Sequence, residues 1–400
     1  MPTTKQRCPR RVALFIESSR ASGCNLLMGV ARYVREQGGW DVHFESGGVG
    51  HTLPRWLRGW RGDGILARVT TRQQAIALQQ TGLPVIDLRG ALADAPFPAV
   101  LADNRLIAQI AFEHLRERGL THFAHCGLAP DSHWHQSRRG EEFRPLAEEA
   151  GFACSLFHFP KRQASWEQVQ VQLADWLRTQ PKPVGIFACY DDCGYQVLEA
   201  CRRIGLSVPR EAAVLGVDDD PVLCNLSIPP MSSIRFDNEQ AGYIAAAWLD
   251  RLMDGHPAPR EPILLQSCDL VVRGSTDTFA FDDPTMNRVL GYIREHACDG
   301  LRVSDLPAVA HLSLSELERR FHRYLDRTPK AELLRVQIEQ AKRLLSDTNL
   351  ALKVIAHRVG FSSEQYFSDA FLHSCGVRPM AYRRLKARGS LVAHQPDNGA

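Results

Sequence analysis

One stretch decides the fold of this chain: VIAHRVGFSSEQYF, residues 354–367. Its pattern is typical of the end of one short helix, a tight turn and the start of a second helix. Ile355, Ala356 and Val359 form an apolar face at helical spacing. Gly360 stands where the chain must leave that helix, and glycine reaches positive φ without a Cβ clash. The stretch therefore predicts two short helices joined by a tight turn.

The start of the second helix carries two further signals. Ser362 and Gln365 have the spacing of a capping box, in which the serine caps the helix and the glutamine reaches back. Phe361 and Tyr366 have the spacing of a hydrophobic staple. Such a unit pins the second helix against the first and leaves its outer face free. DNA-binding helix-turn-helix units insert that free face into the major groove.

The same arrangement occurs upstream, in SDLPAVAHLSLSEL, residues 304–317. Ser313 and Glu316 form a second capping box, and Leu312 and Leu317 form its staple. Ser-x-x-Glu pairs are common at the start of helices in general, so one capping box alone is weak support for a helix-turn-helix. Two boxes, each after a short alanine-containing helix, favour a tandem helix-turn-helix arrangement.

Residues 286–388 resemble the DNA-binding domain of the AraC/XylS family of bacterial regulators. In the second half the resemblance is carried by Ile355, Ala356, Gly360, Phe361, Tyr366, Phe367, Phe371, Gly376, Pro379, Tyr382 and Arg383. In the first half it is carried by Leu306, Ala310, Leu312, Ser313, Leu317, Arg319, Phe321, Thr328 and Pro329. The sequence departs from the family at His311 and Asp326, where glycine is usual. We expect those two turns to be tighter or more strained.

The resemblance also indicates which side chains read DNA. In the first recognition helix, expected at about residues 314–324, Leu317, Phe321 and Leu325 are spaced for the buried face. In the second helix we expect Tyr366 and Phe367 to point inward with Phe371. The candidate DNA-binding residues are Ser315, Glu318, Arg319, Arg323, Ser363, Glu364, Gln365 and Asp369. Arginine can bond guanine bidentately, and glutamine can bond adenine. The alternative is that these are ordinary solvated surface residues.

Charge is distributed unevenly along the 400 residues. The whole chain carries a formal charge of +3, but residues 286–388 hold 18 Lys or Arg against 11 Asp or Glu. A basic carboxyl-terminal part is the electrostatic footprint of a polyanionic partner. We expect that partner to be double-stranded promoter DNA.

The cysteines and the lengths of the apolar runs indicate the cellular compartment in which the chain is expected. There are 11 cysteines, without a CxxC pair. An odd, scattered set favours reduced thiols over a disulfide framework, and it predicts neither a metal site nor a cofactor. No apolar run approaches membrane-spanning length, and no signal-like segment follows the basic residues 1–11. We expect a cytoplasmic protein that is neither exported nor anchored.

The first 270 residues alternate short apolar strands with amphipathic helices. This alternation predicts parallel sheets with helices on both faces, and the number of units suggests two lobes. The expected strands are residues 11–16, 40–44, 64–69, 84–88, 121–126, 154–159, 184–189 and 213–217. The expected helices are residues 25–36, 73–80, 107–118, 169–179, 195–204 and 241–253.

Ligands of open α/β sheets bind outside the carboxyl ends of the strands. Polar clusters follow predicted strands here, at residues 17–20, 190–192 and 218–220, and a further cluster at 103–104 precedes the helix expected from residue 107. Carboxylates that accept hydroxyl hydrogen bonds, an arginine and aromatic rings suit a polyhydroxylated ligand. Trp134 and Trp166 are further candidate stacking surfaces, and the alternative for each is ordinary packing.

Residues 10–275 resemble the periplasmic-binding-protein-like sensor domain of LacI/GalR regulators. The resemblance is carried by residues 102–104, 114–119, Arg139 with Phe143, residues 190–191, 216–219 and 228–234. It implies that effector contacts fall on Asp103, Arg139, Tyr190 or Asp191, and Asp218. The fusion of such a sensor to AraC-type motifs resembles sugar-responsive regulators of pentose catabolism. That resemblance implies D-xylose as effector, transcriptional activation through RNA polymerase, and a homodimer.

The expected fold class is therefore α/β, with a two-lobed periplasmic-binding-protein-like sensor followed by an all-α domain with two helix-turn-helix motifs. We expect an amino-terminal tail at 1–10, the sensor at 11–277, the DNA-binding domain at 278–388 and a frayed tail at 389–400. The two helix-turn-helix motifs are expected at 304–325 and 352–375. The sequence leaves open arabinose or a hexose as the effector, and repression as the output.

Two other classes of function compete with this interpretation. Asp218, Asp219 and Asp220 follow a strand and could hold Mg²⁺ in a metal-assisted hydrolase. No nucleophile–base pair or phosphate-binding loop accompanies them, so we expect no enzymatic activity. A transport binding protein would need the missing export signal.

Overall fold

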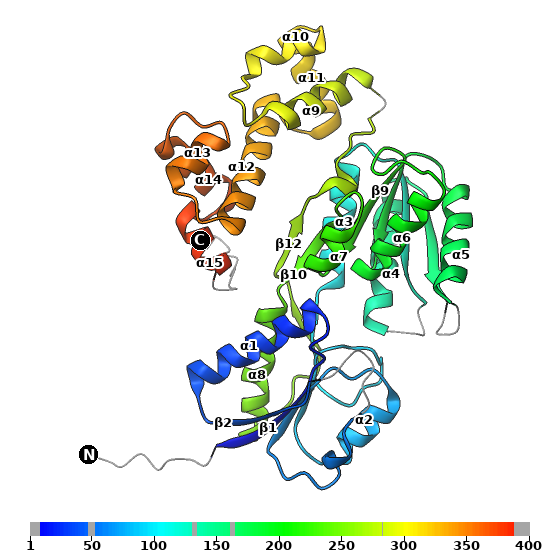
Figure 1. The fold of residues 1–400 in the computed structure, drawn as a ribbon, viewed down its shortest axis with the longest axis vertical. Helices are drawn as coiled ribbons and strands as arrows, with labels where there is room; N and C mark the ends of the chain where they lie inside the picture. Colours follow the sequence, from blue (N-terminus) through cyan, green and yellow to red (C-terminus); the bar gives the residue numbers. More distant parts are fainter. Residues whose placement is uncertain (1–8, 47–52, 130–133, 161–164, 282, 388–400) are drawn as a thin grey trace. The chain divides into compact units, whose positions relative to one another are not determined.

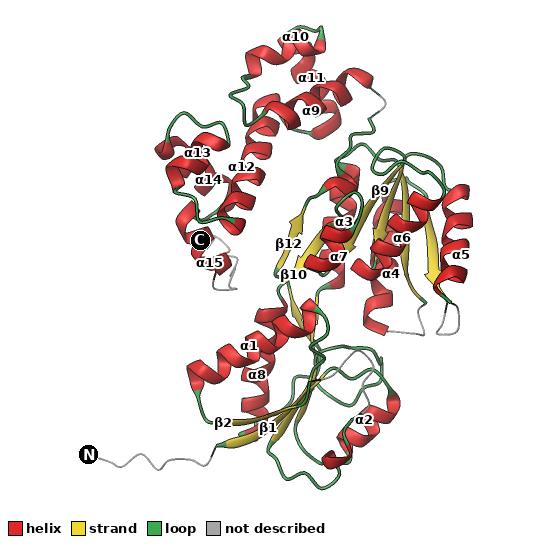
Figure 2. Ribbon diagram, in the orientation of Figure 1, coloured by secondary structure: helices red, strands yellow, loops and turns green. Residues whose placement is uncertain are grey.

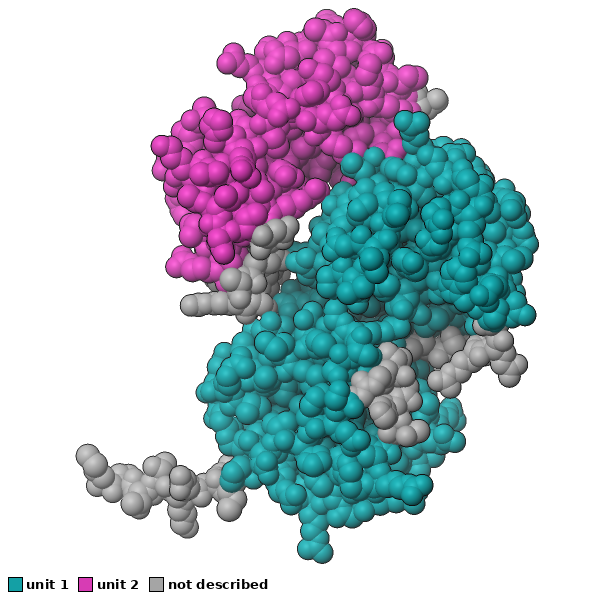
Figure 3. All heavy atoms as spheres, in the orientation of Figure 1, with its two compact units in different colours: residues 1–113, 121–277 teal, residues 114–120, 278–400 magenta. Residues whose placement is uncertain are grey.

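The computed structural model describes residues 9–46, 53–129, 134–160, 165–281 and 283–387. The chain forms two compact units, which Figure 3 colours separately. The first holds residues 1–113 and 121–277, and the second holds residues 114–120 and 278–400. Among the described residues, no helix has the length and apolar character needed to cross a membrane. The predicted tails lie almost wholly outside the described residues.

The first sheet of the first unit has four strands in the order β2-β1-β3-β4. Figure 1 labels its strands β1 and β2. Its strands are β1 (Arg10–Phe15), β2 (Trp40–Phe44), β3 (Gly64–Ala67) and β4 (Val85–Asp87). All its pairings are parallel, and Val12 lies opposite Val42 on one side and Gly64 on the other. Two short strands, β5 (Val100–Ala102) and β11 (Ile263–Leu265), form a separate parallel pair.

The second sheet has six strands in the order β12-β10-β9-β8-β6-β7. Its strands are β6 (His122–Leu128), β7 (Cys154–Phe159), β8 (Val184–Ala188), β9 (Ala212–Val217), β10 (Ser232–Phe236) and β12 (Cys268–Val271). Only β12 runs antiparallel to its neighbour β10. The central strands β8 and β9 are buried along their whole length, as expected for strands covered on both faces.

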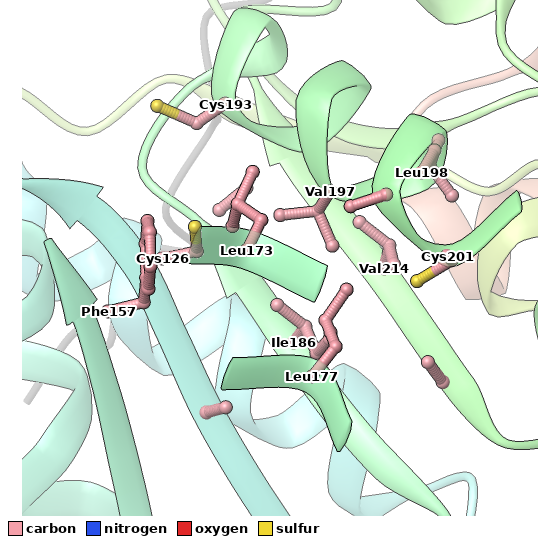
Figure 4. Packing of buried hydrophobic residues seen from close by; sticks show 14 of the residues in the cluster. Cys126, Phe157, Leu173, Leu177, Ile186, Cys193, Val197, Leu198, Cys201 and Val214 are labelled. Atoms are coloured by element: carbon pink, nitrogen blue, oxygen red, sulfur yellow. The ribbon is translucent and has the colours of Figure 1, made fainter. Parts of the chain in front are cut away.

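Helices connect the strands and cover the sheets (Figure 2). The helices of this unit are α1 (Ala21–Gln37), η1 (Arg55–Leu57), α2 (Arg72–Gln79), α3 (Asn104–Arg116), α4 (Trp134–Glu149), α5 (Trp166–Thr179), α6 (Asp191–Arg203), α7 (Pro221–Leu226), α8 (Asn238–Met253) and η2 (Gly274–Thr276). Helices α1 and α8 pack closely, because Gly29 lets the backbone of Glu239 approach where a Cβ would stand. Figure 4 shows the core between the second sheet and helices α5 and α6, where Leu173, Ile186 and Val197 are fully buried.

The alternating pattern thus predicted the fold class correctly, because buried parallel strands read as continuous apolar runs. The pattern missed β5, β10, β11 and β12, which are short or mixed in polarity. It also missed α4, whose sequence is strongly polar and contains Pro145.

The second unit is helical. Its elements are α9 (Pro284–His296), η3 (Val303–Asp305), α10 (Leu306–Ala310), α11 (Leu314–Leu325), α12 (Pro329–Asp347), α13 (Leu352–Arg358), α14 (Glu364–Cys375) and α15 (Pro379–Ala387). One apolar core gathers around α9 and α11 and includes Phe321. A second core gathers around α13 and α14 and includes Phe367 and Phe371. The long helix α12 contributes side chains to both cores, Leu333 to the first and Ile338 to the second.

The two helix-turn-helix units are present, with local corrections. Ser313 caps α11 as expected, since its Oγ accepts from Glu316 N at 3.3 Å. The carboxylate of Glu316 does not complete the box but pairs with Arg319 and Arg320. In the second helix-turn-helix the cap of α14 is Ser363 and not Ser362. The Oγ of Ser363 accepts a hydrogen bond from Tyr366 N at 3.2 Å.

Tyr366 corrects a second expectation. Its ring meets Phe361 at 5.5 Å between centroids, as the staple requires. However, the side chain is 55% exposed and does not point inward with Phe367 and Phe371. The shift of the cap by one residue places Tyr366 nearer the helix start and turns most of its ring toward solvent.

Candidate functional site

Arginines gather where strands of the first sheet end. Arg20 follows β1, Arg68 follows β3 and Arg89 follows β4. Burial and the charges of Arg68 and Arg20 together lower the pKa of Arg89 to about 10, while Glu17 and Asp218 oppose the shift. These five charged groups are therefore electrostatic neighbours. They include residues that follow strands of both sheets, the region where open α/β sheets bind ligands.

Asp87 holds the backbone turns next to Arg68 and Arg89. Its carboxylate accepts from three backbone N–H groups, those of Val69 at 3.1 Å, Arg89 at 2.8 Å and Gly90 at 3.0 Å. Burial nevertheless raises its pKa to about 6. Asp87 thus fixes the turns that carry Arg68 and Arg89. Arg68 pairs with Glu17, while Arg89 Nε has no hydrogen-bond partner among the described residues.

Arg139 joins the start of α3 to the end of β8. The side chain is only 3% exposed and comes from α4. Its Nε donates to Asn104 Oδ1 at 3.1 Å, and its Nη1 donates to the carbonyl of Cys189. Both acceptors are neutral, so neither cancels the charge of the guanidinium, which leaves Arg139 a strong donor for an oxygen-rich ligand.

Tyr190 and Asp192 stand at the start of α6. The guanidinium of Arg20 lies 6.0 Å from the centroid of the Tyr190 ring, and its Nη2 lies 2.9 Å from Asp192 Oδ1. Tyr190 is half-buried, so part of its ring is available for stacking. The tyrosine therefore belongs to the same neighbourhood as the arginines of the first sheet.

Asp218 and Asp191 have different environments. Asp218 is half-buried at the end of β9, with φ of 103°, and its backbone N donates to Ile234 O. Asp191 is 1% exposed and accepts from Asp220 N and Ser233 Oγ, each at 2.7 Å. Burial and the nearby Asp218 raise the pKa of Asp191 well above its ordinary value. Asp218 is therefore the more accessible of the two carboxylates, and Asp191 supports the loop that carries Asp218.

Asp103 caps α3. Its Oδ1 accepts from Arg105 N at 3.0 Å and from Leu106 N at 3.1 Å. Its Oδ2 accepts from Gln266 Nε2 at 3.4 Å. One carboxylate oxygen is therefore used by the helix, whereas the neighbouring Asn104 contacts Arg139 directly.

The carboxylates of residues 218–220 have different partners and do not form one cluster. Asp219 pairs with Arg235 at 2.6 Å and with Arg273 at 2.7 Å. Asp220 caps α7 by accepting from Val222 N at 2.9 Å. In the part of the chain that the structure describes, no group of three or more His, Cys, Asp or Glu is placed to hold a metal.

Trp166, one of the two tryptophans named from the sequence, does not add a stacking surface here. Trp166 lies at the exposed start of α5, where the guanidinium of Arg203 covers its ring at 4.4 Å. The side chain of Trp134 lies outside what the structure describes. The site therefore consists of arginine donors, the Asp218 carboxylate and the Tyr190 ring, a set that suits sugar hydroxyls.

The outer face of α11 carries the first set of candidate DNA readers. Ser315, Glu318, Arg319 and Arg323 are all exposed. The side chain of Arg319 is 77% exposed and pairs with Glu316 at 2.7 Å within the helix. Arg323 lies over the Tyr324 ring at 5.4 Å. Opposite them Leu317, Phe321 and Leu325 are buried, as their spacing predicted.

The second set lies on α14. Ser363, Glu364, Gln365 and Asp369 are exposed. Ser363 is committed to the helix cap, and Gln365 Nε2 donates to Asp369 Oδ2 at 3.0 Å. Asp369 also lies 3.6 Å from Arg378, which lessens the repulsion that this carboxylate would exert on a phosphate.

Sequence reasoning missed Arg68 and Arg89, which the structure brings to the first site. Arg20 and Asn104 stood in the polar clusters 17–20 and 103–104 that the sequence singled out, but they were not among its candidate sugar-binding residues. A usable signal existed, because Arg68 lies near the end of the predicted strand 64–69 and Arg89 directly follows the predicted strand 84–88. The motifs that carry the resemblance include neither of these two arginines.

Fold and sites together define a ligand-responsive transcription regulator, with an α/β sensor joined to a tandem helix-turn-helix unit. Residues 112–276 match the family model of the periplasmic binding protein-like domain, and residues 306–385 match that of the helix-turn-helix domain.

Full-length relatives carry the same pairing. The chain is 30% identical to the xylose operon regulatory protein of Escherichia coli K12 over 93% of this chain and 96% of that protein. It is also 30% identical to the protein of that name from Haemophilus influenzae, over 93% and 98%. The solved structure of a xylose-binding transcription activator superposes with a TM-score of 0.62, at 30% identity, covering 94% of this chain and 98% of that one. The chain belongs to the family of xylose operon regulatory proteins.

Proposed function

We propose that this regulator activates genes of pentose catabolism in response to D-xylose. The observation that supports it most is the full-length likeness to a xylose-binding transcription activator, together with the cluster of arginines and Asp218 at the strand ends. The proposed sugar-binding residues are Asp103, Arg139, Tyr190 and Asp218, to which we add Arg20, Arg68, Arg89 and Asn104. Asp191, which the sequence also proposed, is assigned the supporting role described above. Arabinose or a hexose as effector, and repression as output, remain the competing versions.

The proposed DNA binding is assigned to the second, helical unit. We propose that α11 and α14 enter major grooves of promoter DNA, with Arg319 as the principal base reader of the first helix. We also propose that the chain works in the cytoplasm as a homodimer, contacts RNA polymerase and catalyses no reaction. A dimer would present two pairs of recognition helices to repeated half-sites.

The sugar assignment can be tested by thermal melting of the full chain with D-xylose, L-arabinose, D-ribose and D-glucose. Any sugar that binds the folded chain raises the melting temperature with concentration. We expect the largest rise with D-xylose. A larger rise with another sugar would reassign the effector, and no rise with any of the four would remove the proposed sugar site.

Asp218→Asn is the variant that ties this response to the site. Asparagine tolerates the positive φ of this position and keeps the shape of the side chain, so it removes only the charge. Loss of a charge-assisted hydrogen bond should weaken sugar binding roughly 10- to 100-fold. The exposed Asp175→Asn, in an ion pair with Arg178, is the matched control and should leave the sugar response intact.

A further inference from the structure

One helix belongs to both compact units. Helix α3 begins at Asn104, next to the proposed sugar site, and its last residues with the following turn, residues 114–120, belong to the second unit. A helix is a stiff element that transmits displacement along its axis. The way in which residues 114–120 are held by the DNA-binding unit therefore matters for signalling.

The turn after α3 is seated by a close backbone contact. Gly119 has φ of 77°, and a Cβ at this position would come within 2.6 Å of the backbone and ring of Phe281. Ala280 N donates to Arg118 O at 2.7 Å. Phe281 in turn contacts Tyr324 of α11, with ring centroids 5.3 Å apart. The turn thus packs directly on the segment that leads into α9 and, through Phe281, on the first recognition helix.

An arginine at the joint between α11 and α12 holds the same turn. Arg327 Nη2 lies 2.6 Å from Glu117 Oε1, and its Nη1 lies 3.1 Å from Glu332 Oε2. Its Nε donates to Leu325 O, the last residue of α11, at 3.2 Å. One guanidinium therefore connects the end of the recognition helix, the start of α12 and the turn after α3.

The two ends of this ion-pair chain differ in strength. Glu332 is 2% exposed and also pairs with Arg335 at 2.7 Å. Burial would raise the pKa of Glu332, but Arg335 and Arg327 hold it below its ordinary value. The Glu117 side chain is 43% exposed, so its pair with Arg327 is the weaker, solvent-screened contact. Arg327 is thus anchored on the DNA-binding side and can release or regain α3 at low cost.

We propose that Arg327 is a positioning residue that couples α3 to the first recognition helix, and that the Glu117–Arg327 ion pair carries the effector signal. This assignment rests on the proposed function, because it needs sugar to bind near the start of α3. A change at Asn104 that shifts α3 would alter the Glu117–Arg327 contact, and Arg327 would pass the change to the end of α11. The required difference between states is small, since coupling free energies between sites are usually modest.

The test is a double-mutant cycle in the full chain with Glu117→Gln, Arg327→Gln and both changes together. D-Xylose affinity is measured by calorimetry. DNA affinity is measured, with and without D-xylose, on a duplex selected from a random library by the sugar-loaded wild-type chain. The quantity of interest is the ratio of the two DNA affinities. Glu113→Gln, an exposed glutamate one turn earlier on α3, is the matched control.

We expect Glu117→Gln to leave D-xylose affinity within about two-fold and to reduce the affinity ratio roughly three- to five-fold. Arg327→Gln should reduce the ratio at least as much, and the double variant should reduce it no further. An unchanged ratio in Glu117→Gln, or additive losses in the double variant, overturns the assignment. If Arg327→Gln fails to fold, Glu117→Gln alone decides, because its side chain is largely outside the core.

Failure of the proposed function gives a different result. A wild-type chain that binds no tested sugar, or whose DNA affinity ignores sugar, removes both the proposed function and this assignment. A wild-type chain with a sugar-dependent ratio that Glu117→Gln leaves intact removes this assignment alone.

Discussion

Arg20 Nη2 lies 2.9 Å from Asp192 Oδ1. The arginine follows β1 of the first sheet, and the aspartate lies in the first turn of α6, which follows β8 of the second sheet. This ion pair therefore links the two sheets of the sensor at the edge where the proposed sugar-binding residues gather. It is the contact through which closure of the sensor on its ligand can be tested most simply.

We predict that Arg20→Ala weakens D-xylose binding about two- to five-fold. The pair is about one-third exposed on each side, so its contribution is that of a screened ion pair rather than a buried one. The loss should shrink at high salt, because screening already weakens the pair in the wild-type chain. Calorimetric titration at two salt concentrations measures both effects. The control is Arg72→Ala, which breaks the more exposed pair with Asp94 and should change the sugar affinity by much less.

On the DNA side, Arg319→Ala should cost about 1–3 kcal/mol at one base position and relax specificity there. The guanidinium is 77% exposed and held by Glu316, ready to reach a guanine edge. Binding to a set of duplexes with single-base substitutions measures the effect. A loss of similar size on every duplex would mark Arg319 as a phosphate contact. Arg343→Ala, an exposed arginine of α12, serves as the comparison.

The two departures from the family's glycines are strained, as the sequence predicted. His311 ends α10 with φ of 54°, and Asp326 ends α11 with φ of 50°. Both side chains are exposed, so little packing is lost on substitution. We predict that His311→Gly and Asp326→Gly each stabilise the chain by about 0.5–1 kcal/mol, measured by denaturant or thermal unfolding.

Gly360→Ala is predicted to change the stability of the chain in the opposite direction. Its φ is 85°, and a Cβ would come within 2.8 Å of Ala297 O. That variant should be destabilised by about 1–3 kcal/mol. Stabilisation by alanine here, or destabilisation by glycine at both His311 and Asp326, would contradict the account of these turns.

Asp87 predicts a pH dependence of stability. Its folded-state pKa of about 6 is above the ordinary carboxyl value of 3.8, so the folded chain binds the proton more tightly than the unfolded chain. The resulting stabilisation is fully present below the ordinary pKa and is lost as the pH rises through 6. Compared with Asp87→Asn, the wild-type chain should lose about 1–1.5 kcal/mol between pH 5 and pH 7.5. Parallel pH profiles for the two chains would show that Asp87 does not titrate in this range.

Much of the fold could be predicted from the sequence, because strands such as β8 and β9 are apolar throughout and helices such as α5 and α11 have a single apolar face. The helix caps were less certain. Ser362 and Ser363 are both suitable cap residues, and only the packing of Phe361 and Phe367 selects the second. The same choice decides whether Tyr366 is buried or exposed, so one error produced the other.

The sugar site could be predicted only in part. Asp218 and Arg139 lie in recognisable motifs, but Arg89 becomes part of the site only because Asp87 holds its backbone in place. Residues 114–120 are a stronger case. Nothing in their sequence indicates that they pack with the DNA-binding unit, since Gly119 and Phe281 meet only in the folded chain. Contacts between distant segments depend on packing, which local periodicity does not report.

The central claim is that one chain binds a sugar and changes its DNA binding in response. The most direct measurement is a selection of duplexes from a random library by the full chain at about 0.15 M salt, carried out with and without D-xylose. We predict that one sequence motif is enriched, and that its affinity for the chain changes at least several-fold when D-xylose is present. Enrichment of no motif, or a motif whose affinity is the same with and without D-xylose, would contradict the account.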